Sequence, residues 1–328
     1  MTAWPVTGHE WAVEHLDRAR QHGRMRHAYL FTGPAHIGKT TLARAFAMAL
    51  NCTGPTPPCG TCRNCKLIAR EAHPDLTIVQ SDAPGATLKI GQVRELQQTL
   101  ALRPFEARYR VAILRRFHEA QPTAQDALLK TLEEPASDAI LILTANSADN
   151  LLPTIVSRCQ PLHLRPLPVE QVREALEWQH GALQDVAKTL ARISAGRIGW
   201  AITAQQDESL IEQRSSALKV LTTALKSTHY ERFALVEKLA GDKTAVLEML
   251  DLWQVFWRDA LLAATGSRAP ITNYDLREVI QIVAQHVTHE AIHAALASTR
   301  QTLDLLRKNA NTRLALEVLM LDYPKLAG

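Results

Sequence analysis

Residues 33–40 are Gly-Pro-Ala-His-Ile-Gly-Lys-Thr, and this segment restricts the local fold more than any other in the chain. It fits in full the pattern of two glycines five positions apart, followed by Lys and then Thr or Ser. The apolar run Ala28–Thr32 before it is typical of a buried strand, and a helical pattern over Gly38–Leu50 follows it. Between a strand and a helix, such glycines let backbone N–H groups surround phosphate oxygens at the positive end of the helix. The sequence therefore predicts a phosphate-binding loop on an α/β sheet.

Every residue of this loop is a candidate nucleotide contact. The candidates are Gly33, Pro34, Ala35, His36, Ile37, Gly38, Lys39 and Thr40. Lys39 would reach the β- and γ-phosphates, and the hydroxyl of Thr40 would ligate Mg²⁺. ATP or ADP with Mg²⁺ is the ligand that such a loop would take. The alternatives are a chance match and a relic loop that binds nucleotide only weakly.

The rest of the first half alternates short apolar runs with helical patterns. The runs Leu76–Val79, Arg110–Leu114 and Ala139–Thr144 predict strands, and the segments Ile90–Leu102 and Thr123–Leu132 predict helices. Strands that alternate with helices form a parallel sheet covered by helices on both faces. We therefore expect an α/β domain over residues 1–166.

Helical patterns fill the second half of the chain. The two prolines of Leu164–Pro168 indicate a linker. Residues 167–207 predict a small helical domain, and residues 208–328 an all-α domain. Leucine-rich segments such as Lys243–Ala263 and Thr288–Leu306 have helical spacing and no strand alternation.

Arginine stands where an ATPase needs carboxylates. An ATPase with this type of loop ends a later strand with an Asp that holds Mg²⁺. Here the strand Arg110–Leu114 runs into Arg115 and Arg116. A guanidinium group has no acceptor and stays protonated, so it neither ligates Mg²⁺ nor acts as a base. The alternative is that Glu119, three residues beyond Arg116, is the catalytic carboxylate.

A cluster of cysteines predicts a metal site. Cys52, Cys59, Cys62 and Cys65 fall within fourteen residues of a chain that has five cysteines. Four thiolates at this density suit tetrahedral Zn²⁺, and since protein fills all four positions the site would be structural. Free buried cysteines are the alternative. The module at 52–65 is inserted between the helix after the phosphate loop and the next strand, and we expect Cys159 to pack as a small apolar residue.

Composition limits the function classes. Aromatic residues make up 5% of the chain, which argues against recognition of bases by aromatic stacking as its main role. The formal net charge is +4, which permits contact with nucleic acid without requiring it. The first residues lack the pattern of a secretory signal, and no apolar run is long enough to cross a membrane. We expect a cytoplasmic protein with no membrane partner.

Several segments resemble one family, the bacterial AAA+ clamp-loader subunits of DNA polymerase III. These segments are His27–Pro34 at the entry to the phosphate loop, Asp126–Pro135, Ser157-Arg158-Cys159 and Asn309–Leu319. The cysteine module also falls where this family has its zinc site. The resemblance implies an AAA+ domain with a zinc module, a small helical lid and an all-α collar, in a hetero-pentamer that loads a sliding clamp onto primed DNA.

Within the family, this sequence resembles the delta-prime type more than the gamma/tau type. Gamma/tau subunits are ATPase motors, which need the carboxylates that Arg115 and Arg116 replace. Motor subunits also carry an Arg that contacts the γ-phosphate, and Gly199 stands at that position, with Arg197 out of register. The chain alone is therefore expected neither to hydrolyse ATP efficiently nor to polymerise DNA. A gamma/tau-type motor stays the alternative, because the phosphate loop is intact.

The resemblance also implies roles for single residues and partners. Arg158 would act as an arginine finger, in trans, at the ATP site of a neighbouring gamma/tau subunit, and Asn146 is a weaker candidate phosphate sensor. The partners would be gamma/tau and delta subunits, the clamp indirectly, and primed DNA through its backbone phosphates. An apolar stripe that includes Leu314 and Val318 would serve the collar. A third hypothesis is a nucleic-acid-binding module built around the zinc knuckle.

Overall fold

The computed structural model describes residues 4–83 and 85–326, which divide into two compact units. One unit holds Met1–Ala175 with Gly196–Trp200, and the other holds Leu176–Ala195 with Ala201–Gly328. The first is the α/β unit and the second the helical unit. No helix in the described ranges has the length and apolar character that crossing a membrane requires.

A five-stranded parallel sheet forms the centre of the α/β unit, in the order β2-β3-β4-β1-β5. The strands are β1 (Ala28–Thr32), β2 (Leu76–Val79), β3 (Arg110–Leu114), β4 (Ala139–Ala145) and β5 (Gln160–His163). Every residue of β1, β3 and β4 is buried, as expected for parallel strands covered on both faces. The predicted α/β fold with a parallel sheet is confirmed.

Strand β5 was not predicted from the sequence. Its residues Gln160–His163 are mostly exposed, with only Leu162 buried, and it pairs with β1 at the edge of the sheet. Pro161 is tolerated there because an edge strand does not need every backbone N–H for the sheet. A short polar segment with a proline gives no strand signal, so only the tertiary pairing reveals it.

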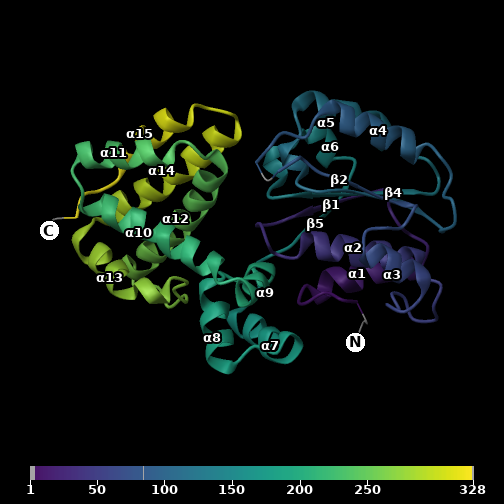
Figure 1. Ribbon diagram of the computed structural model, residues 1–328, viewed down its shortest axis with the longest axis horizontal. Helices are drawn as coiled ribbons and strands as arrows, with labels where there is room; N and C mark the ends of the chain where they lie inside the picture. Colours follow the sequence, from purple (N-terminus) through teal and green to yellow (C-terminus); the bar gives the residue numbers. More distant parts are fainter. Residues whose placement is uncertain (1–3, 84, 327–328) are drawn as a thin grey trace. The chain divides into compact units, whose positions relative to one another are not determined.

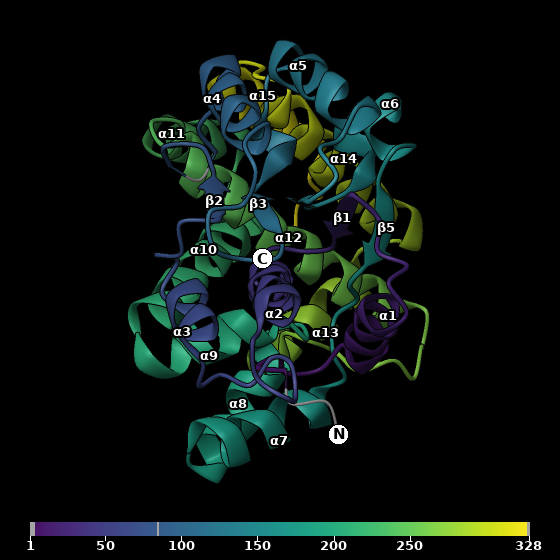
Figure 2. The same cartoon turned by 90° about the vertical axis from the view of Figure 1, so that its right-hand side faces the viewer.

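Helices cover both faces of the sheet (Figures 1 and 2). One face carries α1 (Glu10–Gln21), α2 (Lys39–Asn51) and α3 (Arg63–Ala69). The other carries α4 (Ile90–Leu100), α5 (Pro122–Glu133) and α6 (Pro153–Val156). Two short 3₁₀ turns, η1 (Phe117–Glu119) and η2 (Ala148–Asn150), follow β3 and β4. The two apolar cores therefore lie on opposite sides of one sheet.

Three helices follow the sheet: α7 (Val169–His180), α8 (Gln184–Ile193) and α9 (Ile198–Gln206). They occupy the segment in which the sequence predicts a small helical domain. The boundaries of a separate lid at residues 167–207 and of a collar at 208–328 stay a proposal.

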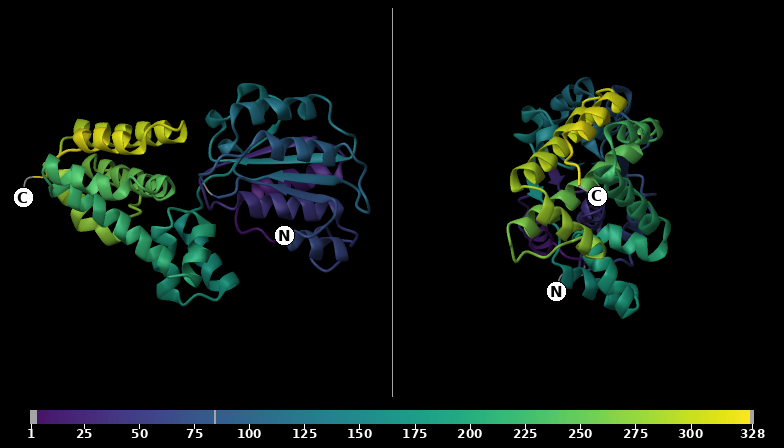
Figure 3. Two further views of the ribbon diagram at one scale, coloured as in Figure 1. Left: turned by 45° about the horizontal axis from the view of Figure 1, so that its top comes forward. Right: turned by 90° about the vertical axis from the view of Figure 1, so that its left-hand side faces the viewer.

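The helical unit is built around a central helix, α12. The later helices are α10 (Ser209–Lys226), α11 (His229–Leu239), α12 (Lys243–Ala264), α13 (Arg277–His286), α14 (His289–Arg307) and α15 (Thr312–Asp322), with a 3₁₀ turn, η3 (Tyr274–Leu276), before α13. Helix α12 contacts α10, α13 and α14, and Figure 3 shows these helices as one bundle. Trp253 and Trp257 of α12 are fully buried, and the Trp257 ring lies 5.2 Å from that of Tyr323.

A buried arginine holds the end of α15 and the segment after it against this bundle. Arg232 of α11 is 1% exposed. Its guanidinium donates to the carbonyls of Ala224 (2.8 Å), Met320 (2.7 Å), Tyr323 (2.8 Å) and Pro324 (2.9 Å). Three of these carbonyls lie at or beyond the end of α15, where a helix leaves its last carbonyls without internal partners. Burial lowers the pKa of Arg232, but an arginine stays charged.

We expect Arg232→Met to lower the free energy of unfolding by about 3 kcal/mol, because it leaves several buried carbonyls without donors. Urea unfolding followed by tryptophan fluorescence checks this, since Trp253 and Trp257 lie in the same core. The matched control is Arg300→Met on the exposed face of α14, which should change stability by less than about 0.5 kcal/mol. Equal effects of the two substitutions would contradict this account of Arg232.

Candidate nucleotide and metal sites

The loop between β1 and α2 has the backbone shape that its glycines permit. Gly33 has a φ of 143°, and a Cβ at this position would lie 2.4 Å from the carbonyl oxygen of Leu164. Gly38, the residue before α2, has a φ of 104° with open space around it. Gly33 is therefore required by a close approach of backbone, and Gly38 by its left-handed conformation.

The predicted contact residues lie along this loop as one continuous turn. Pro34, Ala35 and His36 are exposed, Gly33 and Ile37 are buried, and Gly38, Lys39 and Thr40 are half-buried where α2 begins. The ammonium of Lys39 donates to the carbonyls of Gly33 (2.6 Å) and Pro34 (2.7 Å) and lies 3.5 Å from Oδ1 of Asn146. All three partners are neutral oxygens. Burial lowers the pKa of Lys39 to about 8, so this cation lacks a compensating charge.

Two contacts fix the loop from its outer side. The Nε2 of buried His9 bonds to the carbonyl of Ile37 at 2.9 Å. The N–H of Gly199, at the start of α9, donates to the carbonyl of His36 at 2.9 Å. A Cβ on Gly199 would lie 2.8 Å from that oxygen. Neither contact could be predicted from the sequence, because each joins residues far apart in the chain. The segment that carries Gly199 thus packs directly on the phosphate loop, and a larger residue there needs the loop to move.

Both arginines after β3 are engaged in ion pairs. Arg115 pairs with Glu71, which also accepts from Arg44 of α2 at 3.2 Å. Arg116 has a φ of 49° and its Nε lies 3.0 Å from Glu119. These arginines lie at the carboxyl edge of the sheet, because Leu114 of β3 is in register with Leu143 of β4. This edge of the sheet therefore carries two arginines, each paired with a glutamate.

The alternative catalytic carboxylate, Glu119, is bound on both oxygens. One oxygen accepts from Arg116 and from the hydroxyl of Ser81, and the other accepts from the N–H of Gly85 at 2.9 Å. Its side chain is only 11% exposed. A general base must have a free lone pair within reach of the proton that it removes. This arrangement weighs against Glu119 as a base.

Arg158 lies on the surface between α6 and β5. Its Nη2 pairs with Glu133 at the end of α5 at 2.7 Å, and its Nη1 donates to the carbonyl of Thr154 at 3.0 Å. The side chain is 36% exposed and that of Glu133 is 51% exposed. An ion pair this exposed contributes little, of the order of 0–1 kcal/mol, so the guanidinium can exchange partners easily. The next residue, Cys159, is buried in the apolar core as expected, and burial raises the pKa of its thiol to about 12.

The four predicted metal ligands come together in space. The sulfur atoms of Cys52, Cys59, Cys62 and Cys65 all lie within 4.8 Å of one another. Zn–S bonds of about 2.3 Å in a tetrahedron put the sulfurs about 3.8 Å apart, so the cluster needs only slight contraction to hold zinc. Cys52 follows the end of α2, and Cys62 caps the start of α3. The cluster is consistent with a structural zinc site.

Backbone N–H groups point at the cysteine sulfurs. Gly54 and Cys59 donate to Cys52 at 3.3 Å each, and Cys62 and Cys65 donate to the preceding cysteines Cys59 and Cys62 at 3.3 and 3.4 Å. Donors around a sulfur favour the thiolate, which is the form that ligates metal. Hydrogen bonds from Thr61 and from the Cys62 N–H lower the pKa of Cys59 to about 5, while burial raises the pKa of Cys65.

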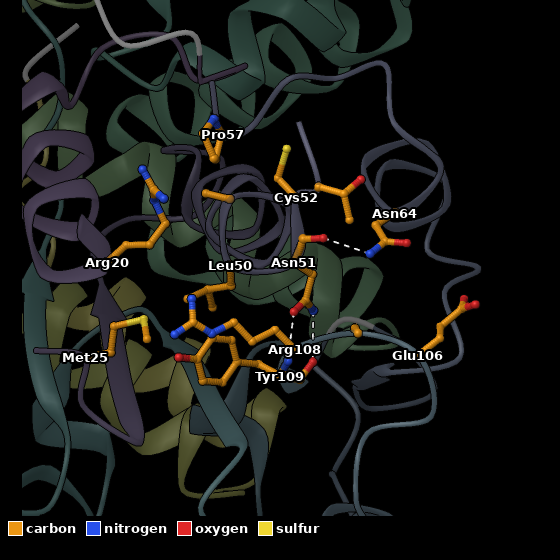
Figure 4. Close-up of a pocket in the computed structure, with 13 residues that line it drawn as sticks. Arg20, Met25, Leu50, Asn51, Cys52, Pro57, Asn64, Glu106, Arg108 and Tyr109 are labelled. Carbon is orange, nitrogen blue, oxygen red and sulfur yellow. Dashed lines mark hydrogen bonds between the residues drawn. The ribbon is translucent and has the colours of Figure 1, made fainter. Parts of the chain in front are cut away.

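A polar cavity of about 160 Å³ lies beside the cysteine cluster (Figure 4). Its lining includes Arg20, Asn51, Cys52, Arg108 and Tyr109. Asn51 bonds to both the carbonyl and the N–H of Tyr109 at 2.9 Å. Asn51 is the last residue of α2, which has 13 residues and a length of about 20 Å, while Lys39 is the first. The cavity is therefore at the opposite end of α2 from the phosphate loop and is not part of that site.

Comparisons with known proteins agree on one family over both units. A family profile described as "DNA polymerase III, delta subunit" matches residues 8–168, and one described as "DNA polymerase III, delta subunit, C terminal" matches residues 208–324. The chain is 30% identical over 312 residues to DNA polymerase III subunit delta' of Pseudomonas aeruginosa, covering 92% of this chain and 93% of that protein. It is 28% identical to the delta' subunit of Bacillus subtilis over 91% of each chain.

DNA polymerase III subunit tau of Escherichia coli is similar to this chain over a shorter segment. The identity is 39%, but over only 174 residues, which are 52% of this chain and 27% of that protein. A gamma/tau subunit can also match nearly the whole chain, since that of Mycobacterium tuberculosis is 31% identical over 93% of this chain and 53% of that protein.

We expect the purified chain to carry about one zinc per molecule, held by the four clustered sulfurs. Cys59→Ser should reduce the zinc content well below one, because it removes a ligand at the tip of the module. Cys159→Ser is the matched control and should keep the full content, since Cys159 lies in a separate apolar core. Elemental analysis with thiol titration measures this, and equal zinc loss in both variants would contradict the assignment.

We also expect Lys39 to lose its proton near pH 8, about two units below an ordinary lysine. Its rate of acylation, followed on its own peptide by mass spectrometry, should therefore rise through a midpoint near pH 8. Because the folded chain releases this proton first, the contribution of Lys39 to stability should increase from about pH 8 to about pH 10.4. A midpoint above pH 10 would mean that the ammonium is well hydrated.

Proposed function

Because the chain belongs to the DNA polymerase III delta-prime family of clamp-loader subunits, related to gamma/tau, we propose that it acts as the stator of the loader. In this role it completes the ring of subunits and supplies Arg158 to the ATP site of a neighbouring gamma/tau subunit. The loader places the sliding clamp on primed DNA during replication. Membership of the family implies other loader subunits as partners.

The observation that carries this proposal is the pair of arginines at the end of β3. Arg115 and Arg116 occupy the positions at which a motor subunit needs carboxylates, and their side chains are tied to Glu71 and Glu119. A chain with arginines at this edge of the sheet cannot activate water to attack a nucleotide bound at its own phosphate loop. Its contribution to turnover then has to come from a residue that acts on another subunit.

Arg158 has the properties that such a residue needs. Its guanidinium is accessible, and its partner Glu133 is a surface carboxylate that competes weakly for it. A guanidinium placed at the γ-phosphate stabilises charge that develops in the transition state. The short α6 and the start of β5 fix the backbone on both sides of it. This position supports Arg158 as the finger that acts in trans.

An exposed apolar stripe on α15 supports the role of the helical unit as the collar. Leu314, Val318 and Leu321 are 60%, 59% and 51% exposed, while Ala315 and Leu319 of the same helix are buried in the core. The stripe predicted from the sequence thus divides between two faces of one helix. Large exposed apolar side chains at helical spacing are typical of a surface that meets another subunit. The expected neighbours are gamma/tau and delta in a hetero-pentamer, with primed DNA contacted through its phosphates and the clamp only indirectly.

In a loader reconstituted with its partners, we expect Arg158→Ala to reduce ATP turnover stimulated by clamp and primed DNA by at least about tenfold. The reason is that a neighbouring ATP site loses a transition-state charge. Arg70→Ala, an exposed arginine of the same unit, is the matched control and should leave turnover unchanged. Lys39→Ala should change turnover little, because hydrolysis occurs elsewhere.

Two results would contradict the stator proposal. Loss of turnover with Lys39→Ala but not with Arg158→Ala would show that the chain is a gamma/tau-type motor, the reading that the intact phosphate loop favours. DNA affinity of the isolated chain that follows its zinc content would favour the nucleic-acid-binding module instead.

A further inference from the structure

The edge of the sheet beside the phosphate loop does not fit a magnesium ion. The Thr40 hydroxyl offers one hard oxygen, but Mg²⁺ in such sites also needs a carboxylate from the end of the neighbouring strand. Arg115 and Arg116 stand there, and the nearby Glu119 is bound by Arg116 and Ser81. The loop itself keeps the backbone shape and the lysine that phosphate binding requires. The site therefore has the groups that bind a phosphate but lacks the carboxylate that would bind Mg²⁺.

The guanidinium of Arg115 extends from β3 toward the helix that the loop opens. Its partner Glu71 also binds Arg44, which lies one turn after Thr40 on α2 and so on the same face of that helix. The Arg115 side chain is 18% exposed, and its Nε is buried without a hydrogen-bond partner among residues 4–83 and 85–326. Arg115 is therefore linked through Glu71 to the face of α2 on which Thr40 lies one turn earlier.

The local charge favours an anion and opposes a divalent cation. Arg44 and Arg115 bring two positive charges and Glu71 one negative charge, so these three side chains leave one net positive charge beside α2. Lys39 adds an ammonium whose hydrogen-bond partners are neutral oxygens. A motor site instead places an Asp at the end of this strand, where it holds Mg²⁺. A magnesium ion placed here would meet cations instead of ligands.

We propose that this phosphate loop binds the polyphosphate of a nucleotide free of magnesium, with Arg115 supplying the positive charge that the metal supplies in a motor subunit. Magnesium in solution then competes with the protein for the polyphosphate. Magnesium therefore weakens nucleotide binding to this chain, whereas it strengthens nucleotide binding to a site that hydrolyses ATP. This inference concerns the isolated chain and does not rest on the finger role of Arg158.

The test is equilibrium binding of a fluorescent ADP to the full chain with its zinc retained. Magnesium is varied from none, in buffer depleted of divalent cations beforehand, to millimolar concentration at constant ionic strength. We expect the dissociation constant to be at least roughly threefold lower without Mg²⁺ than with it. Competition by pyrophosphate shows how much of the affinity comes from the phosphates alone. This comparison uses the native chain, so it needs no variant that could misfold.

Two substitutions then test Arg115 itself. Arg115→Ala should weaken binding without Mg²⁺ by roughly tenfold, and Arg115→Asp should reverse the magnesium effect, because it places a metal-binding carboxylate at the end of β3. Arg108→Ala, an exposed arginine at the opposite end of α2, is the matched control and should bind as the native chain does. Circular dichroism and zinc content report whether each variant is folded.

Binding that tightens with Mg²⁺ in the native chain, or no binding in either condition, would overturn the inference. Arg115→Ala that binds as tightly as the native chain would overturn the part assigned to Arg115. None of these outcomes bears on turnover in the assembled loader, which tests the stator proposal separately.

Discussion

The parallel pairing of five strands is the constraint on which the polar chemistry of the α/β unit depends. Parallel strands end at one edge of their sheet, so residues that follow β1, β3 and β4 gather there although they lie far apart in sequence. Lys39 approaches Asn146 after β4, and the N–H of Arg116 after β3 donates to Thr144 of β4 at 3.0 Å. A substitution in the segment that follows one of these strands can therefore alter the electrostatic field at the phosphate loop without altering the fold.

Such a change separates this chain from an ATPase of the same architecture. The loop retains the glycines and the lysine, whereas the neighbouring strand end carries two cations in place of two anions. The two arginines pair with Glu71 and Glu119 at this edge. Binding of phosphate and activation of water rely on different residues of such a site. Under the proposed function, only the residues for hydrolysis are replaced, which would let the phosphate loop persist in a subunit that acts on a neighbour.

Residues with strong local signals could be predicted from the sequence, and those defined by distant partners could not. The runs that became β1, β3 and β4 are buried end to end, and the cysteine spacing predicted a cluster that the fold assembles. Helices α1 and α3 and strand β5 were not predicted, since their segments are short or rich in polar residues. The partner of Arg115 depends on Glu71, a residue with a φ of 59° between α3 and β2 that no spacing rule identifies. The contact of Gly199 with His36 is likewise set only by tertiary packing.

The buried guanidinium of Arg232 attaches the end of α15 to α11 through carbonyl groups and not through a carboxylate. Its partners are carbonyl dipoles at the end of α15, and a carbonyl has no proton to gain as the medium becomes acidic. Because the contact is shielded from solvent, dissolved ions also screen it little. The segment that follows α15 therefore stays attached under acidic or saline conditions that loosen the surface ion pairs. The helical unit thus has one attachment whose strength does not follow the pH or the salt concentration of the medium.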